Sequence, residues 1–466
     1  MSIFKAYDIR GKYPSELDEA KAQAIGWATA QFIKKLSSKR YPKVAVGRDV
    51  RLSSPALARG VIRGLLQGGA KVTDIGDVTT PMSYFACGFY GFDGNIMVTA
   101  SHNPPEYHGF KICREKAIAL SEATGLREIE KLTTKAQSTQ SSKSPFLPLC
   151  QRGMGGFSRP CGGIKHLDIK TDYKRFIRRF IRFSDRKMKI VVDAANGNVG
   201  RIFDVIFAGC PNLKVKRLCF KPDGRFPNHE PNPMKDENII ALKRAVRKEK
   251  AILGVAFDGD GDRVIFLDEQ AERIPNDLMT ALIAREVLRE HKNARIVYDL
   301  RSSRVVKEEI ERQGGKPIRE RVGHAFIKAT MRKYRALFGG ELSGHYYYRD
   351  NYFADSALIT LVYLLNIITR EDKPVSEIIK PFRRYFSSGE LNFTVRDKEA
   401  KIKEVIKEFS DGKRDYLDGV TIKYNDWWFN LRPSNTEPLL RLNIEARTAK
   451  QLKLAKIKIE KILKER

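Results

Sequence analysis

Short apolar runs alternate with amphipathic stretches along the first part of the chain. A helical pattern over about 16–36 is followed by a β-branched run at 43–49, a second helical pattern at 54–67 and another apolar run at 71–76. Strands that alternate with helices in this way predict βαβ units with right-handed crossovers and a mostly parallel sheet. The N-terminal region is therefore predicted to be an α/β domain.

The same unit of apolar strand, polar loop and helix recurs at 189–197 and 294–301. Any parallel α/β protein contains such strands, but a spacing of roughly a hundred residues or more suggests duplicated domains rather than a solenoid. From about residue 382 the pattern changes to short strands around an amphipathic helix at 398–409, with a final helix from Thr448. This last region is predicted to be α+β.

A polar run at 133–144, rich in Ser and Thr, separates the first two regions, and the glycine-rich stretch 153–163 prolongs it. A run of this composition cannot bury a core, so we expect an exposed connector over 133–163. We predict three related α/β domains and a smaller α+β domain. Their expected bounds are 1–155, 156–272, 273–382 and 383–466.

The composition narrows the possible partners. The chain has 466 residues, enough for about three domains of 150 residues or four smaller ones. With 86 Lys and Arg against 56 Asp and Glu, its formal net charge is +30. Such an excess favours nucleic acid, anionic membranes or phosphorylated small molecules. Acidic residues are interleaved with the basic ones, which favours a solvated basic surface over a nucleic-acid stripe.

Six cysteines are scattered along the chain, without a CxxC pair and without His at zinc-finger spacing. This argues against a metal ribbon and fits a reducing cytosol. The N-terminus lacks the apolar core of a signal peptide. The longest apolar stretch, 357–368, is too short to span a bilayer and is predicted to be a buried helix capped by Asp355 or Ser356. We expect a soluble, cytoplasmic protein.

The first candidate for chemistry is the loop Ser101-His102-Asn103-Pro104-Pro105, which follows a predicted buried strand at 95–98. In open α/β folds, ligands bind at the carboxyl edge of the sheet, where such a loop emerges. Taken alone, the segment is equally compatible with an ordinary cap or turn, which Ser and Asn form readily.

The second candidate is an acidic loop after another apolar strand. Asp258, Asp260 and Asp262 alternate with glycines, and oxygen ligands in this pattern suit Mg²⁺ or Ca²⁺ rather than Zn²⁺. An EF-hand is excluded because Arg263 occupies its glycine position and a strand follows at 264–267. Arg263 is placed to contact a phosphate.

Two further loops carry polar groups. Glu341 and Ser343 lie in a glycine-rich loop that suits vicinal sugar hydroxyls, although a plain turn with a buried His345 is the alternative. The loop 432–438 offers a guanidinium, hydroxyls and an amide, which can form a phosphate cradle or simply a polar hairpin loop. No Walker A loop or GxGxxG motif follows a strand, so nucleotide binding is not indicated.

Together with Tyr7-Asp8-Ile9-Arg10-Gly11, these loops form one ordered set. The segments 7–11, 99–104, 258–263, 340–345 and 432–438 resemble, in this order, the motifs of the α-D-phosphohexomutase superfamily. The similarity is greatest to its phosphomannomutase/phosphoglucomutase members, and it covers essentially the whole chain.

The resemblance implies three related α/β domains and a smaller fourth domain around a basic central cleft. It implies an intramolecular phosphotransferase that interconverts hexose 1-phosphate and 6-phosphate, the hexose being mannose, glucose or both. In such enzymes a phosphoserine gives its phosphoryl group to the substrate, the bisphosphate turns round, and the other phosphate returns to the serine. Mg²⁺ is the implied cofactor, and glucose or mannose 1,6-bisphosphate is the implied activator.

The resemblance also assigns roles to individual residues. The implied metal ligands are the phosphorylated Ser101, Asp258, Asp260 and Asp262. The other catalytic groups are two arginines that stabilise the transferring group, a lysine in proton transfer, a general acid/base histidine and a histidine beside the phosphoserine. In that order they are Arg10 and Arg263, Lys111, His345 and His102.

Substrate binding is implied for a second set. Glu341 and Ser343 match the residues that contact the sugar 3- and 4-hydroxyls. Arg301 stands where relatives often have lysine, which keeps the charge. The remaining substrate-binding residues are Tyr7, Gly323 and His324, and, for the clamp on the phosphate that is not transferred, Arg432, Ser434, Asn435 and Thr436.

Two alternatives stay open at this point. Phosphoglucosamine mutase is the first, although such relatives usually carry another polar residue between the positions of Glu341 and Ser343. A non-catalytic protein that binds anions or nucleic acid is the second, and an intact Ser101 with all three aspartates argues against it. A phosphosugar is the expected partner, no membrane is expected, and the oligomeric state is open. The connector and the surplus charge are unexplained.

Overall fold

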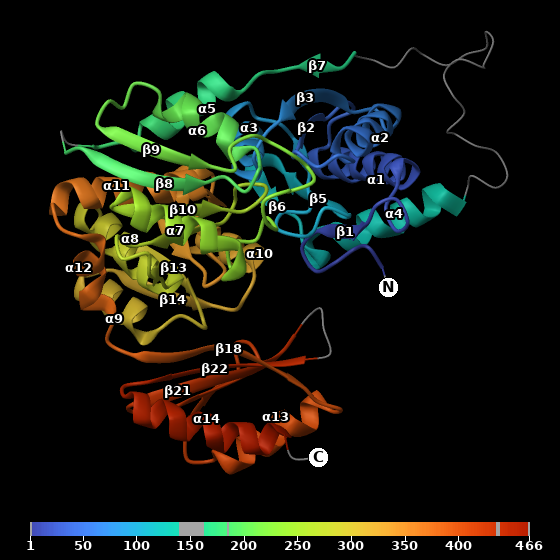
Figure 1. The fold of residues 1–466 in the computed structure, drawn as a ribbon. Coiled ribbons are helices and arrows are strands. Elements are labelled where there is room, and N and C mark those ends of the chain that lie inside the picture. Colours follow the sequence, from blue (N-terminus) through green and yellow to red (C-terminus); the bar gives the residue numbers. More distant parts are fainter. Residues whose placement is uncertain (1, 139–162, 184–185, 435–438, 465–466) are drawn as a thin grey trace, which may run out of the picture. The chain divides into compact units, whose positions relative to one another are not determined.

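The computed structural model describes most of the chain. The described residues are 2–138, 163–183, 186–434 and 439–464. Contacts between elements divide the chain into two compact units. Figure 1 labels the helices and strands along the chain. Unit 1 comprises Met1–Arg273 and Tyr347–Asp372, and unit 2 comprises Ile274–Tyr346 and Lys373–Arg466.

Unit 1 begins with a sheet in the order β1-β5-β4-β2-β3-β7, and β6 pairs with β5. Its strands are β1 (Ile9–Lys12), β2 (Lys43–Arg48), β3 (Lys71–Asp77), β4 (Gly94–Val98), β5 (Tyr107–Arg114), β6 (Ile118–Ala119) and β7 (Lys165–His166). The helices are α1 (Glu19–Ser37), α2 (Ser54–Gln67), α3 (Thr80–Phe89) and α4 (Leu126–Ser138), and α1 packs against both α2 and α4. The apolar faces of α1, α2 and α4 and the sheet enclose one hydrophobic core.

A second sheet in unit 1 has the order β12-β11-β10-β8-β9. Its strands are β8 (Met188–Asp193), β9 (Leu213–Leu218), β10 (Leu253–Phe257), β11 (Val264–Leu267) and β12 (Arg273–Ile274). The neighbouring helices are α5 (Lys170–Arg178), α6 (Val199–Phe207) and α7 (Ile240–Glu249). A hairpin of β16 (Tyr346–Tyr348) and β17 (Ala354–Asp355) leads into α11 (Ala357–Glu371), whose N-cap is Ser356, one of the two expected residues.

Unit 2 contains parallel strands with helices and then an antiparallel sheet. Strand β13 (Arg295–Asp299) pairs in parallel with β14 (Lys316–Glu320) and β15 (Phe338–Gly340). The accompanying helices are α8 (Asn276–Glu290), α9 (Arg304–Arg312), α10 (His324–Tyr334) and α12 (Val375–Ile379). The antiparallel sheet has the order β18-β22-β21-β20-β19. It is formed by β18 (Phe386–Thr394), β19 (Lys413–Asp415), β20 (Val420–Lys423), β21 (Trp427–Pro433) and β22 (Leu439–Ala446), with α13 (Lys398–Glu408) and α14 (Ala449–Lys464) packed on it.

The expectation of a mostly parallel first sheet is confirmed for β2, β3, β4 and β7, which pair in parallel. The exception is β5, which runs antiparallel to both β4 and β1. The physical reason is the short loop that contains Ser101: it joins β4 to β5 without a helix, and such a short connection requires antiparallel strands. The Asp258–Arg263 loop joins β10 to β11 in the same way. Both loops of chemical interest therefore turn the chain between two buried strands.

The predicted connector is wrong at its start. Thr133 is only 5% exposed and lies within α4, which continues to Ser138. The amphipathic spacing of 126–136 keeps one face of this helix on the core, in spite of its polar composition. Residues 139–162, which include the expected boundary at 155/156, lie outside the described part of the chain.

Two smaller expectations can be compared with the structure. No helix among the described residues is long and apolar enough to cross a membrane. Arg432 and Pro433, expected in a loop, are the last residues of strand β21.

Candidate functional site

Ser101 lies directly after the buried strand β4. Its side chain is almost completely buried, and its backbone has φ +52°, a left-handed conformation that non-glycine residues adopt mainly at turns. The Thr99 hydroxyl accepts a 2.9 Å hydrogen bond from the Ser101 amide. The Ser101 hydroxyl donates to Asp258 Oδ2 at 3.0 Å and lies 3.4 Å from His102 Nδ1. The loop thus presents one hydroxyl to the aspartate cluster.

The aspartate cluster consists of Asp258, Asp260 and Asp262, all buried, with oxygen atoms within 4.8 Å of one another. Asp260 Oδ2 accepts hydrogen bonds from the hydroxyls of Thr80 at 2.6 Å and Thr99 at 3.2 Å. Its other oxygen, Oδ1, is buried and has no hydrogen-bond partner among the described residues. An orphaned buried acceptor in an oxygen-only set is what a hard cation would satisfy.

Lys111, on β5, is the principal counter-charge in this cluster. Its ammonium group lies 2.8 Å from Asp260 and 2.5 Å from Asp262. Burial lowers the pKa of Lys111, but Asp260 and Asp262 raise it by more than burial lowers it. The pKa of Lys111 is therefore well above its usual value. Burial and the other two aspartates raise the pKa of Asp258 well above its usual range. One lysine does not neutralise three carboxylates, so the residues fit a divalent cation.

The arginines expected at the transferring group are close to the serine loop. Arg10, on β1, donates to the Ala100 carbonyl at 3.1 Å and to Asn103 Oδ1 at 2.5 Å, and it pairs with Asp8. Arg263 Nε lies 3.9 Å from Asp258 Oδ2. Tyr7 is partly buried in the segment before β1.

His102 lies beside the Ser101 hydroxyl. Burial, together with the positive charges of Arg263 and Arg10, lowers the pKa of His102 well below its usual value. A neutral imidazole next to the Ser101 hydroxyl can accept or donate a hydrogen bond without adding charge.

Arg51 supports the serine loop and was missed in the sequence. Its fully buried guanidinium donates to the carbonyls of Ser101 at 2.9 Å, Asn103 at 2.6 Å, Pro104 at 2.6 Å and Tyr107 at 3.1 Å. The planar donor fork of arginine is suited to several acceptors at once. The only signal in the sequence was that Arg51 follows a strand that ends in a polar loop.

Arg51 is held in turn by a buried polar network. Asp49 accepts a hydrogen bond from Arg51 Nε at 3.1 Å and another from the Ser54 hydroxyl. Ser54 Oγ lies 2.7 Å from His108 Nε2, and His108 Nδ1 accepts from the Gly109 amide at 2.8 Å. Since Nδ1 is an acceptor, Nε2 carries the hydrogen and donates to Ser54. Burial lowers the pKa of His108 to about 4.

We expect His108 to make stability depend on pH. Its pKa is about 4 in the folded protein and about 6.5 in an unfolded chain, so only the unfolded chain binds the proton between these values. Stability is therefore lost as the pH falls from about 6.5 to 4, by up to about 3 kcal/mol. In His108→Asn this loss should be smaller, as measured by urea unfolding at pH 7 and pH 5. The exposed His291→Asn is the control, and an unchanged pH dependence in His108→Asn would contradict the prediction.

In unit 2, four residues predicted to bind the sugar form a second group together with His345, the predicted acid/base histidine. Glu341 is buried after β15, and its Oε1 accepts from the Gly323 amide at 3.1 Å. His345 Nδ1 lies 2.8 Å from the Ser343 hydroxyl and 3.4 Å from Glu341 Oε2. The ring centroid of His324, the first residue of α10, lies 6.3 Å from the ring centroid of His345. The structure thus brings all five residues together.

The predicted phosphate-binding arginines converge on a carboxylate that the sequence analysis missed. Glu390, on β18, contacts Arg432 at 2.5 Å, Arg301 at 3.3 Å and Arg441 at 3.5 Å. Arg432 and Arg441 face each other across β21 and β22, a pairing of like charges that needs an anion nearby. Arg301 also binds Asp299 through Nε at 3.0 Å. We call the three arginines and Glu390 the arginine cluster.

The structure describes one of the three other residues predicted for the clamp. Ser434 follows β21, is buried, and donates its amide hydrogen to the Leu439 carbonyl at 2.8 Å. Asn435 and Thr436 lie outside the described residues.

We expect Glu390→Gln to destabilise the protein by about 2 kcal/mol, because the substitution leaves three largely buried guanidinium groups with less counter-charge. The expected loss is smaller than for a fully buried ion pair, since Glu390 is partly exposed to solvent. Inorganic phosphate should recover more stability in this variant than in the wild type, since it replaces the missing negative charge. Thermal unfolding with and without phosphate measures both effects. The exposed Glu399→Gln is the control, and equal phosphate effects in all three proteins would contradict the role given to Glu390.

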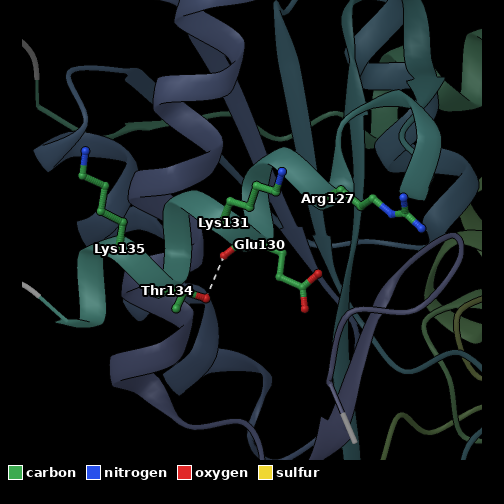
Figure 2. A pocket seen from close by; sticks show the side chains of 5 residues that line it. All are labelled: Arg127, Glu130, Lys131, Thr134 and Lys135. Carbon is green, nitrogen blue, oxygen red and sulfur yellow. Dashed lines mark hydrogen bonds between the residues drawn. The ribbon is translucent and has the colours of Figure 1, made fainter.

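A separate hollow lies on the outer surface of α4 (Figure 2). Its volume is about 710 Å³, and its lining is Arg127, Glu130, Lys131, Thr134 and Lys135. The Thr134 hydroxyl donates to the Glu130 carbonyl at 3.1 Å, the dashed line in Figure 2. None of these residues belongs to the predicted site, and we assign the hollow no role.

Models of one protein family match four successive segments of the chain. Models described as phosphoglucomutase/phosphomannomutase α/β/α domains I, II and III match residues 1–140, 171–271 and 275–385, and the C-terminal domain of the same family matches 390–461. The chain belongs to this family. The predicted fold class, three related α/β domains with a smaller C-terminal domain, is confirmed.

Individual relatives are similar to this chain over nearly all of their length. A phosphomannomutase of Methanocaldococcus jannaschii is 41% identical over 458 residues, which cover 97% of this chain and 95% of the relative. A phosphomannomutase of Escherichia coli K12 is 36% identical over 457 residues, with 96% and 95% covered. The chain is therefore an enzyme of the phosphohexomutase class, an isomerase that acts by phosphoryl transfer.

Solved structures agree with this assignment. A phosphoglucomutase/phosphomannomutase family protein from Burkholderia thailandensis superposes with a TM-score of 0.87 at 32% identity, covering 99% of this chain and 97% of that one. N-acetylphosphoglucosamine mutase from Aspergillus fumigatus, in complex with GlcNAc-6P and magnesium, gives a TM-score of 0.61 at 13% identity, with 98% and 95% covered. The second likeness is one of fold.

Proposed function

We propose that this enzyme interconverts the 1- and 6-phosphates of mannose, glucose or both, through a phosphoryl group carried on Ser101. The observation that carries the proposal is the contact of the buried Ser101 hydroxyl with the aspartate cluster, 3.0 Å from Asp258. Phosphoryl transfer requires positioning and charge neutralisation more than covalent assistance from the protein. A serine held by a strained loop next to a cation site provides both.

Asp258, Asp260 and Asp262, with a phosphate oxygen on Ser101, would hold Mg²⁺. When bound, the ion supplies neutralisation of the negative charge on the transferring phosphoryl group. The oxygen-only ligand set, its burial and the orphaned Oδ1 of Asp260 support this assignment.

The proposed transfer has two balanced halves. In the first, the sugar hydroxyl oxygen forms a bond to phosphorus, the bond from phosphorus to Ser101 Oγ breaks, and the hydroxyl proton leaves to a base. The sugar is then a 1,6-bisphosphate. In the second, Ser101 takes the other phosphoryl group, and that sugar oxygen regains a proton. We assign stabilisation of the transferring group to Arg10 and Arg263, and proton transfer to Lys111 and His345.

We assign recognition of the substrate to unit 2. Glu341 and Ser343 can bind two sugar hydroxyls, with Gly323 and His324 next to them. Arg301 and Arg432, with Ser434, can bind the phosphate that is not transferred, since charged donors in a buried setting form strong bonds to phosphate oxygens. Asn435 and Thr436, which follow Ser434 in the sequence, are the other two residues that we propose for the clamp.

The test is a parallel assay of mannose 1-phosphate, glucose 1-phosphate and glucosamine 1-phosphate, each with its 1,6-bisphosphate as activator and with Mg²⁺. Conversion of the mannose or glucose substrate to the 6-phosphate is expected. Preferred conversion of glucosamine 1-phosphate would replace the proposed sugar preference while keeping the reaction. Absence of conversion for all three would overturn the proposal.

A further inference from the structure

A second cluster of metal-ligating side chains lies in unit 1, apart from the aspartate cluster. Asp193 is the last residue of β8, Cys219 directly follows β9, and His229 lies in the segment after it. Strands β8 and β9 are parallel neighbours (Figure 1), and Asp193 is in register with Leu218. Their carboxyl ends therefore place the first two side chains at one edge of the sheet. The ligand atoms of all three lie within 4.8 Å of one another.

The distances suit a tetrahedral ion. His229 Nε2 lies 3.1 Å from Asp193 Oδ2 and 3.8 Å from Cys219 Sγ. Bonds of about 2.3 Å to sulfur and about 2.0 Å to nitrogen and oxygen place neighbouring ligand atoms of tetrahedral Zn²⁺ about 3.3 to 3.6 Å apart. The two distances at His229 are within a few tenths of an ångström of these values, and the Asp193 and Cys219 ligand atoms lie within 4.8 Å of each other.

Hydrogen bonding at His229 shows why a cation fits. Nδ1 lies 2.8 Å from the Glu230 carbonyl oxygen, which can only accept, so Nδ1 carries a hydrogen. This leaves Nε2 facing both Asp193 and Cys219. A hydrogen on Nε2 would serve Asp193 alone, whereas an ion at the common position would satisfy all three groups. A ligating histidine that donates its other hydrogen to a carbonyl is the usual arrangement in metal sites.

The surroundings hold these groups in place. Asp193 Oδ1 accepts from the Ala195 amide at 2.9 Å, which leaves Oδ2 directed at His229. The Cys219 carbonyl accepts from the Asn196 amide at 2.8 Å. Asp193 and His229 are mostly buried, so the cluster is not a surface coincidence.

We propose that Asp193, Cys219 and His229 form a binding site for a borderline-soft divalent cation of the Zn²⁺ or Co²⁺ class, with water at the fourth position. Thiolate and imidazole ligands select such ions, whereas Mg²⁺ prefers the oxygen-only aspartate cluster. The site is independent of the proposed reaction. The Pro231 carbonyl accepts from the Gly259 amide at 3.3 Å, so an ion here would brace the segment that contacts the aspartate loop.

The test is a titration of the full-length, chelator-treated protein with Co²⁺, in excess Mg²⁺ to occupy the aspartate cluster. The wild type is expected to bind one equivalent and to show the near-ultraviolet charge-transfer band of a thiolate–Co²⁺ bond. Cys219→Ser should lose the band and bind at least about 100-fold more weakly. Cys210→Ser, which changes a partly exposed cysteine outside the cluster, should bind like the wild type.

Three results would overturn the site: no saturable band in the wild type, a band that persists in Cys219→Ser, or a band that Cys210→Ser also removes. Serine nearly matches cysteine in size, and a melting curve for each variant verifies that it is folded. Asp193→Asn provides a second check, because it should weaken Co²⁺ binding while keeping the thiolate band at saturating metal. Mutase activity of the wild type in Mg²⁺ alone is a separate measurement, so failure of the site and failure of the proposed function can be distinguished.

Discussion

Replacing Ser101 by alanine is expected to lower mutase activity by at least about 10⁴-fold, since the variant has no oxygen to carry the phosphoryl group. The residual rate would come from binding alone. The measurement is kcat for hexose 1-phosphate in the presence of the bisphosphate and Mg²⁺. Activity within about tenfold of the wild type would contradict the assignment of Ser101.

Two controls separate chemistry from folding in this experiment. Ser101 has φ +52°, a conformation that costs alanine more than glycine, so Ser101→Gly tests whether strain contributes to the loss. It should be as inactive as Ser101→Ala but at least as stable. Ser410→Ala changes an exposed serine in unit 2 and should keep full activity.

The second large effect is expected for Asp258→Asn. Loss of one of three anionic ligands should lower Mg²⁺-dependent activity by at least about 100-fold, since the ion's charge stabilisation is worth several kcal/mol. The metal-free variant should nevertheless unfold at a higher temperature than the metal-free wild type. Burial and the two other aspartates raise the pKa of Asp258, which means that its ionised form is unfavourable without a cation.

Thermal unfolding with and without Mg²⁺ checks both parts of this prediction. The wild type should be stabilised by Mg²⁺, and the variant should gain little. Asp350→Asn, a change at an exposed ion pair, is the control and should behave like the wild type. A variant that keeps its activity, or that Mg²⁺ stabilises as strongly as the wild type, would contradict the metal site.

The loops of chemical interest could be predicted because each is a local pattern. A buried, β-branched strand that stops at a run of polar residues reveals both the strand and the position of the loop, as at Ser101 and Asp258. The capped helix at 357–371 was predictable for the same reason, because Ser356 stands directly before its apolar face. Direction within the sheet was harder, and only the short connection between β4 and β5 revealed it.

Residues that act across long stretches of chain could not be found in this way. Arg51 lies 50 positions from Ser101, and nothing in its own neighbourhood indicates that its donors meet the carbonyls of another loop. Glu390 is similar: its three arginine partners come from β21, β22 and the loop after β13. Burial of charge is decided by partners, and the sequence does not show which partners meet.

The cluster of Asp193, Cys219 and His229 illustrates the same limit. In zinc fingers, pairs of ligands are close in sequence, and the spacing within each pair reveals the site. Here the ligands are brought together by two parallel strands and the segment that follows them, so no such spacing occurs. The register of β8 and β9 brings Asp193 and Cys219 together, and the segment after β9 adds His229.

The most direct test of the phosphoserine mechanism is the mass of the intact protein. Wild-type enzyme and Ser101→Ala are treated with glucose 1,6-bisphosphate and Mg²⁺, desalted and weighed by mass spectrometry, with fragmentation to locate any added group. The wild type should gain one phosphoryl group on Ser101 and should lose it when hexose 1-phosphate is added. The Ser101→Ala variant should gain none. A phosphoryl group on another residue, or an active wild type that is never phosphorylated, would contradict transfer through Ser101.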